Sequence, residues 1–136
     1  MAETRDKAPA RSTARGFGRV LVAVYGLFAL AATGRSAVQI ATKFHEAPLA
    51  YLLSAFAAVV YIVATVSLAR GDAISRRVAA VAISTELVGV ITVGTVSELV
   101  PHAFPHATVW TGFGSGYGFV PLVLPLVGLW WLHHTR

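Results

Sequence analysis

The sequence predicts an all-α membrane protein, a bundle of four transmembrane helices with the N- and C-termini in the cytoplasm. Of its 136 residues, 56% are hydrophobic and only 12% are charged, and the apolar residues occur in four long runs. A soluble domain carries about 25% charged residues. A chain this poor in charge could not coat a water-soluble globule, whereas a helix bundle in lipid needs no charge on its lipid-facing surface.

Four apolar runs supply the predicted membrane spans. Their approximate bounds are 17–36, 48–69, 78–96 and 118–132. The second run is the clearest, because it has no charged residue from Leu49 to Ala69 and approaches the roughly 20 residues needed to cross about 30 Å of hydrocarbon. The last run contains Pro121 and Pro125, each of which removes a backbone donor. We therefore expect a kink or a tilted entry near its outer end.

The segment before the first span, residues 1–16, mixes basic residues with Ala, Pro, Ser and Thr and has no apolar run. This composition predicts a disordered basic tail in the cytoplasm, followed by a transmembrane domain over residues 17–136. A basic stretch before an apolar run also fits a secretory signal peptide. The three later spans, and the apolar continuation from Ser36 to Lys43, favour an uncleaved helix.

The 11 Lys and Arg residues are distributed unevenly. All but Arg35 and Lys43 lie in the tail and at its junction with the first span, in the turn after the second span, or at the C-terminus. The positive-inside rule places those regions in the cytoplasm. Topology and attraction to anionic lipid account for the positive charge, so we expect the lipid bilayer as a partner and no nucleic acid.

Several kinds of chemistry are not indicated by the sequence. The absence of cysteine excludes disulfides, thiolate metal sites and cysteine nucleophiles. Alternating glycines from Gly112 to Gly118 lie between an aromatic loop and a membrane span, not in the βαβ unit that a phosphate-binding loop requires. They favour a tight, flexible or partly re-entrant connection. We therefore expect no enzymatic activity and no cofactor.

Glu86 is the ionisable residue of the third span, where a carboxylate costs about 2.5–3.5 kcal/mol and should face the bundle. Tyr25 and Tyr61 lie at a similar distance from the cytoplasmic ends of their own spans. The three residues therefore predict an intramembrane polar layer, with Glu86 uncharged because burial disfavours its charged form. The layer either locks helix packing or binds a proton or cation during transport, and a catalytic or lipid-binding role is a third possibility.

A second, weaker polar cluster lies in the outer loop. Glu98, His102 and His106 follow at intervals of four residues, a spacing that would align them on one helix face and allow metal binding. Pro101 and Pro105 interrupt such a helix. Solvated or hydrogen-bonded imidazoles are therefore the favoured interpretation, and no metal site is predicted.

Three stretches, Phe28–Arg35, Glu46–Tyr51 and Ala107–Pro125, resemble small actinobacterial four-helix integral membrane proteins of unassigned function. The resemblance extends over residues 17–132 and implies a location in the cell envelope. The chain is also similar to small multidrug resistance transporters in length, helix number and its membrane carboxylate. Their essential carboxylate lies in the first helix, where this chain has no acid.

These observations predict a non-enzymatic accessory or interaction subunit, a multi-pass protein of the bacterial inner (plasma) membrane. Its expected partners are lipid and other membrane proteins or a second copy of itself. The alternative is a small proton-coupled transporter that uses Glu86. That alternative requires an oligomer, because four short helices enclose little cavity by themselves.

Overall fold

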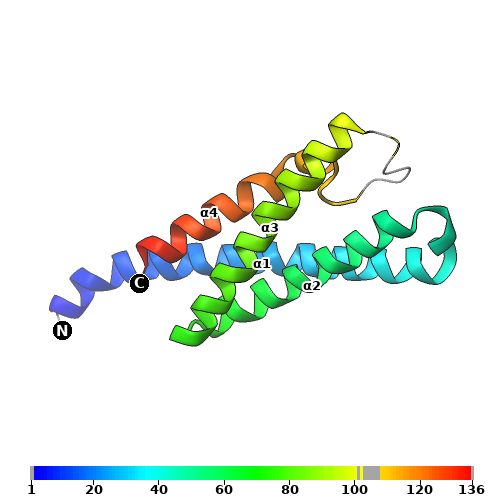
Figure 1. Ribbon diagram of the computed structural model, residues 1–136. Coiled ribbons are helices and arrows are strands. Elements are labelled where there is room, and N and C mark those ends of the chain that lie inside the picture. The colour runs from blue at the N-terminus through cyan, green and yellow to red at the C-terminus, as the bar shows by residue number, and fades with distance from the viewer. Residues whose placement is uncertain (1, 101, 103–107, 136) are drawn as a thin grey trace.

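The computed structural model describes residues 2–100, 102 and 108–135, with side chains from Gly16 onward (Figure 1). Within these ranges the chain is helical and contains no strand, so the predicted all-α class is confirmed. The elements in chain order are α1 (Ala2–Lys43), η1 (Phe44–Glu46), α2 (Pro48–Arg70), α3 (Ala73–Leu99), η3 (Thr111–Tyr117) and α4 (Val120–His134).

Helix α1 begins well before the predicted first span and includes the predicted continuation to Lys43. It begins at Ala2, whereas the sequence predicted disorder over residues 1–16. Ala and Arg recur in this segment and have high helix propensity, as do its single Lys and Glu. A helix already nucleated in the apolar span can extend through them at little further cost, since nucleation is the unfavourable step. At its other end α1 continues to Lys43, along the apolar extension that follows Ser36.

Helices α2 and α3 form an antiparallel hairpin around a short turn. Gly71 ends α2 in the left-handed conformation (φ 70°) that glycine adopts without strain. Asp72 then caps α3, because its carboxylate accepts hydrogen bonds from the Ser75 backbone N–H (3.2 Å) and hydroxyl (2.7 Å). These bonds hold the pKa of Asp72 below its usual range. With this cap, α3 begins at Ala73, ahead of the predicted bound at residue 78.

The segments η3 and α4 meet at a bend of 96°. The bend lies at Gly118 and Phe119, which both have positive φ (64° and 60°), and Pro121 follows in the first turn of α4. A kink near the outer end of the last span was predicted, and the bend is at that place. Helix α4 has 15 residues, about 22 Å at 1.5 Å per residue, so it needs η3 to approach the thickness of the hydrocarbon layer.

The helices run alternately up and down (Figure 1). The α1–α2 connection, the end of α3 and η3 lie at one end of the bundle, and the α2–α3 turn and the end of α4 lie at the other. Three segments are long and apolar enough to cross a membrane, 16–46, 48–70 and 73–99, and the bent pair η3–α4 makes a fourth if it counts as one span. Large apolar side chains such as Leu27, Val59, Val88 and Val123 are exposed on all four helices, as expected for a surface in contact with lipid.

Small residues allow the helices to approach closely at the bundle axis. Ala57 and Ala64 of α2 and Ala79 of α3 are fully buried, and side chains of this size permit tight packing of membrane helices. The large buried side chains lie among them, with Ile83 next to Gly128 of α4. A Cβ on Gly128 would also be 3.5 Å from Tyr25 Oη, so α1, α3 and α4 meet at the level of Ile83, three residues before Glu86.

Candidate functional site

The three residues of the predicted polar layer lie together in the core. Tyr25 of α1, Tyr61 of α2 and Glu86 of α3 are each 0% exposed. The Tyr25 hydroxyl donates a hydrogen bond to Glu86 Oε1 at 2.7 Å, and the Tyr25 and Tyr61 rings are 6.1 Å apart between centroids. The structure thus joins three helices through one carboxyl group and two phenol rings.

The Tyr61 hydroxyl bonds to a residue that the sequence did not assign to the layer. Trp110 Nε1 donates to Tyr61 Oη at 3.1 Å, and the Trp110 side chain is 1% exposed. Trp110 lies in the segment between α3 and η3, far from Tyr61 in sequence. The polar layer therefore has four members, and the fourth enters from the loop.

Trp110 fits because α3 carries a glycine where the indole lies. A Cβ atom on Gly89 would be 2.6 Å from Trp110 Cζ3, which is too close for any side chain. The Phe56 ring of α2 also contacts the indole, in an edge-to-face pair. The ring centroids are 6.2 Å apart and the ring planes are at 77°. The loop thus inserts Trp110 between α2 and α3.

The same arrangement is repeated nearer the C-terminal end of α3. The Phe113 ring covers Gly94, where a Cβ would again overlap it. Phe113 holds this position with a φ of 61°, between Gly112 and Gly114, which also have positive φ. A non-glycine residue in this region is strained. The strain is offset by packing and by the bond from the Gly112 N–H to Ser97 Oγ at 2.9 Å.

A hydrogen bond from α1 fixes the last part of the loop. Arg35 Nη1 donates to Tyr117 Oη at 2.6 Å, and the Tyr117 ring lies 5.8 Å from that of Phe28. Phe28 in turn contacts the Tyr61 ring, at 5.6 Å between centroids. A continuous set of aromatic rings therefore connects the loop before α4 to the polar layer.

The carboxyl group of Glu86 is only partly satisfied. Oε1 accepts the bond from Tyr25, whereas Oε2 is buried and has no hydrogen-bond partner among the residues that the structure describes. A fully charged carboxylate in such a place would be very costly. This arrangement can tether helices through an uncharged carboxyl, and it can hold one proton.

The outer-loop cluster is described only in part. Glu98, near the end of α3, and His102 are both exposed. His106 lies outside the described residues, so the predicted arrangement of the three stays a prediction. Within the described ranges, no group of three or more His, Cys, Asp or Glu side chains is placed to hold a metal ion.

No protein-family model, curated protein or solved structure matches this chain. The fold and the apolar surface nevertheless define its class. It is an all-α, multi-pass membrane protein with a closed polar layer in its core.

Proposed function

We propose that the protein is a non-enzymatic accessory or interaction subunit of the bacterial cell membrane. The observation that supports this proposal best is the closure of the polar layer. Glu86, Tyr25, Tyr61 and Trp110 are inaccessible to solvent, and their hydrogen bonds run between helices and loop. A layer of this kind fixes one arrangement of the bundle, so that the outer surface is presented to lipid and membrane partners in a defined shape.

The alternative is an oligomeric proton-coupled transporter, and one observation favours it. The buried Oε2 atom of Glu86 has no partner among the described residues, which is the state expected of a group that exchanges a proton. Transport would require the layer to open toward each side in turn. Tyr25 and Trp110 would both have to move, because they cover the carboxyl group and its neighbour Tyr61.

Glu86→Gln distinguishes the two functions. Glutamine keeps the shape and can accept the Tyr25 bond but cannot exchange a proton. For an accessory subunit we expect Glu86→Gln to fold normally and to complement a gene deletion, whereas Glu86→Leu should lower the free energy of unfolding by about 1 kcal/mol, the scale of interhelical hydrogen bonds in membranes. A well-folded Glu86→Gln protein that fails to complement would favour the transporter.

We further propose that both termini lie in the cytoplasm. The absence of native cysteine allows a direct test with single cysteines and a membrane-impermeant thiol reagent on intact cells. Cysteines at Thr4, Asp72 and Thr135 should be protected, and cysteines at Thr42 and Ser115 should react. A reagent could reach these positions in the folded protein, because Asp72, Thr42 and Ser115 are exposed and Thr135 is only half-buried. Labelling at Asp72 from outside would contradict the proposed topology.

A further inference from the structure

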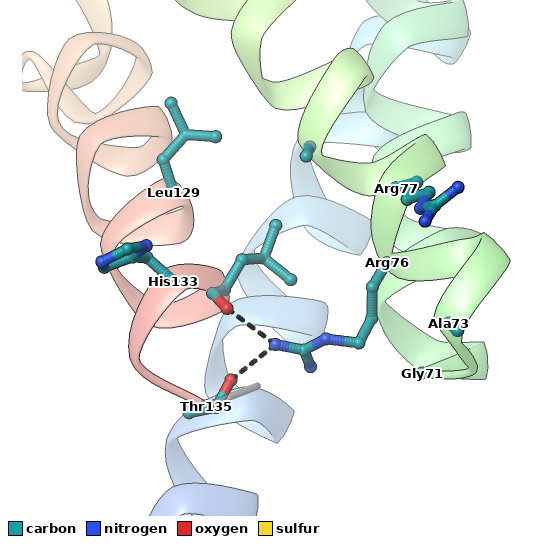
Figure 2. A pocket seen from close by; sticks show the side chains of 9 residues that line it. Gly71, Ala73, Arg76, Arg77, Leu129, His133 and Thr135 are labelled. Carbon is teal, nitrogen blue, oxygen red and sulfur yellow. Dashed lines mark hydrogen bonds between the residues drawn. The ribbon is translucent and has the colours of Figure 1, made fainter.

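A groove of about 740 Å³ lies between the start of α3 and the end of α4 (Figure 2). Its polar lining includes Arg76, Arg77 and His133, and its apolar lining includes Ala80 and Leu129. The groove thus has basic groups beside an apolar wall. It lies at the end of the bundle that carries the α2–α3 turn and the end of α4.

Arg76 is held across this groove by α4. Its Nη2 atom donates to the Leu132 carbonyl and to Thr135 Oγ1, both at 2.8 Å, as Figure 2 shows. Its Cζ atom lies 5.4 Å from the centroid of the Trp131 ring, a cation–π distance. The Nε and Nη1 groups have no hydrogen-bond partner among the described residues. A fixed guanidinium with unused donors is a preorganised site for an oxyanion.

Arg77 begins a stripe that leads from the groove along α3. Arg77, Val81, Ser84 and Val88 follow at intervals of three or four residues, so they lie on one helix face. A second hollow of about 440 Å³ is lined by Val81, Ser84 and Val88. Ala80 lines both hollows, so the two adjoin. Arg77 therefore lies in a basic groove beside a shallow apolar hollow on the surface of α3.

We propose that these two hollows bind one anionic phospholipid. Its phosphate group would lie in the groove at Arg76 and Arg77, and one acyl chain would follow α3 past Ser84. Basic pockets between transmembrane helices at the membrane surface recognise anionic headgroups in this way. Trp130, which is 54% exposed, is an interfacial anchor that places the groove at headgroup level. Asp72, the acid of the α2–α3 turn, is engaged by Ser75 and does not line the groove.

The test is lipid titration of the purified full chain in detergent, with bound lipid counted by native mass spectrometry. Phosphatidylglycerol should bind more tightly than phosphatidylcholine. Arg77→Gln should weaken phosphatidylglycerol binding about fivefold, the scale expected for one basic side chain near anionic lipid. The matched control is Arg70→Gln, which removes the same charge from an exposed residue at the end of α2 that does not line the groove, and it should leave binding nearly unchanged.

A second pair of variants tests the apolar hollow without changing charge. Ser84→Phe fills the second hollow at an exposed position and should also weaken phosphatidylglycerol binding. Val59→Phe, at an exposed position of α2, should not. Equal losses in Arg77→Gln and Arg70→Gln would overturn the site in favour of general charge attraction. A different outcome would indicate a site for free phosphate. In that case inorganic phosphate at millimolar concentration would compete with the lipid, and Ser84→Phe would bind the lipid normally. This result would overturn the proposal of a phospholipid site.

Discussion

Trp110→Ala is expected to lower the free energy of unfolding by about 3 kcal/mol. Replacing a buried Phe or Trp by Ala costs about 3–5 kcal/mol in soluble cores, and the lower value applies here because lipid removes the contribution of transfer from water. The variant loses the contacts with Gly89 and Phe56 and leaves Tyr61 Oη without its donor. The loop would then lose its main attachment to the core.

Unfolding by SDS titration in mixed micelles, followed by far-UV circular dichroism, measures this effect. Trp110→Phe keeps an aromatic ring but removes the bond to Tyr61, so it should cost only about 1 kcal/mol. Trp130→Ala is the matched control, since Trp130 is 54% exposed and should change stability by less than about 0.5 kcal/mol. Equal effects of Trp110→Ala and Trp130→Ala would mean that the loop does not pack in the core.

The sequence predicted the fold class and the meeting of Tyr25 with Glu86 for the same physical reason. Long apolar runs have few solutions in lipid, because each must satisfy its own backbone hydrogen bonds as a helix. Once the spans are helices, the depth of a residue in the membrane follows from its position in the sequence, because each residue adds the same rise along the helix axis. Glu86 had to face the bundle, so a hydroxyl at the same depth was its natural partner.

The role of Trp110 could not be predicted by the same reasoning. Depth can be counted only along a regular helix, and Trp110 lies in a loop whose path depends on tertiary contacts. The signal that was present, Gly89 in the middle of α3, indicates close approach of another group but does not say which group. The left-handed conformation of Phe113 is equally unpredictable, because local preference opposes it and only packing against Gly94 favours it.

The different environments of Trp130 and Trp131 could not be predicted from the sequence either. Both Trp130 and Trp131 are typical interfacial residues. Trp131 instead packs against Gly18 of α1 and under the Arg76 guanidinium, and only Trp130 faces outward. Adjacent helix residues point about 100° apart, so the two side chains can have different environments, and which one turns inward depends on the position of α1.

Gly89→Ala is expected to destabilise the protein by about 1–3 kcal/mol although alanine favours helix. The new Cβ would lie 2.6 Å from the buried Trp110 ring. Overpacking of this kind destabilises by more than the roughly 1 kcal/mol by which the higher helix propensity of alanine stabilises. Gly34→Ala in α1 is the matched control, because a Cβ there meets nothing within 4 Å. It should leave stability unchanged or raise it by up to about 1 kcal/mol.

The decisive measurement is a double-mutant cycle that combines Gly89→Ala with Trp110→Ala. If the indole is what makes Gly89 necessary, Gly89→Ala should cost nothing, or stabilise slightly, once Trp110 is already alanine. The coupling energy should then reach about 1–3 kcal/mol, the range for residues in direct contact. Additive effects would show that Gly89 is required for helix packing elsewhere and that Trp110 does not lie against α3. Gly34→Ala should remain additive with Trp110→Ala, because a Cβ at Gly34 contacts no part of the loop.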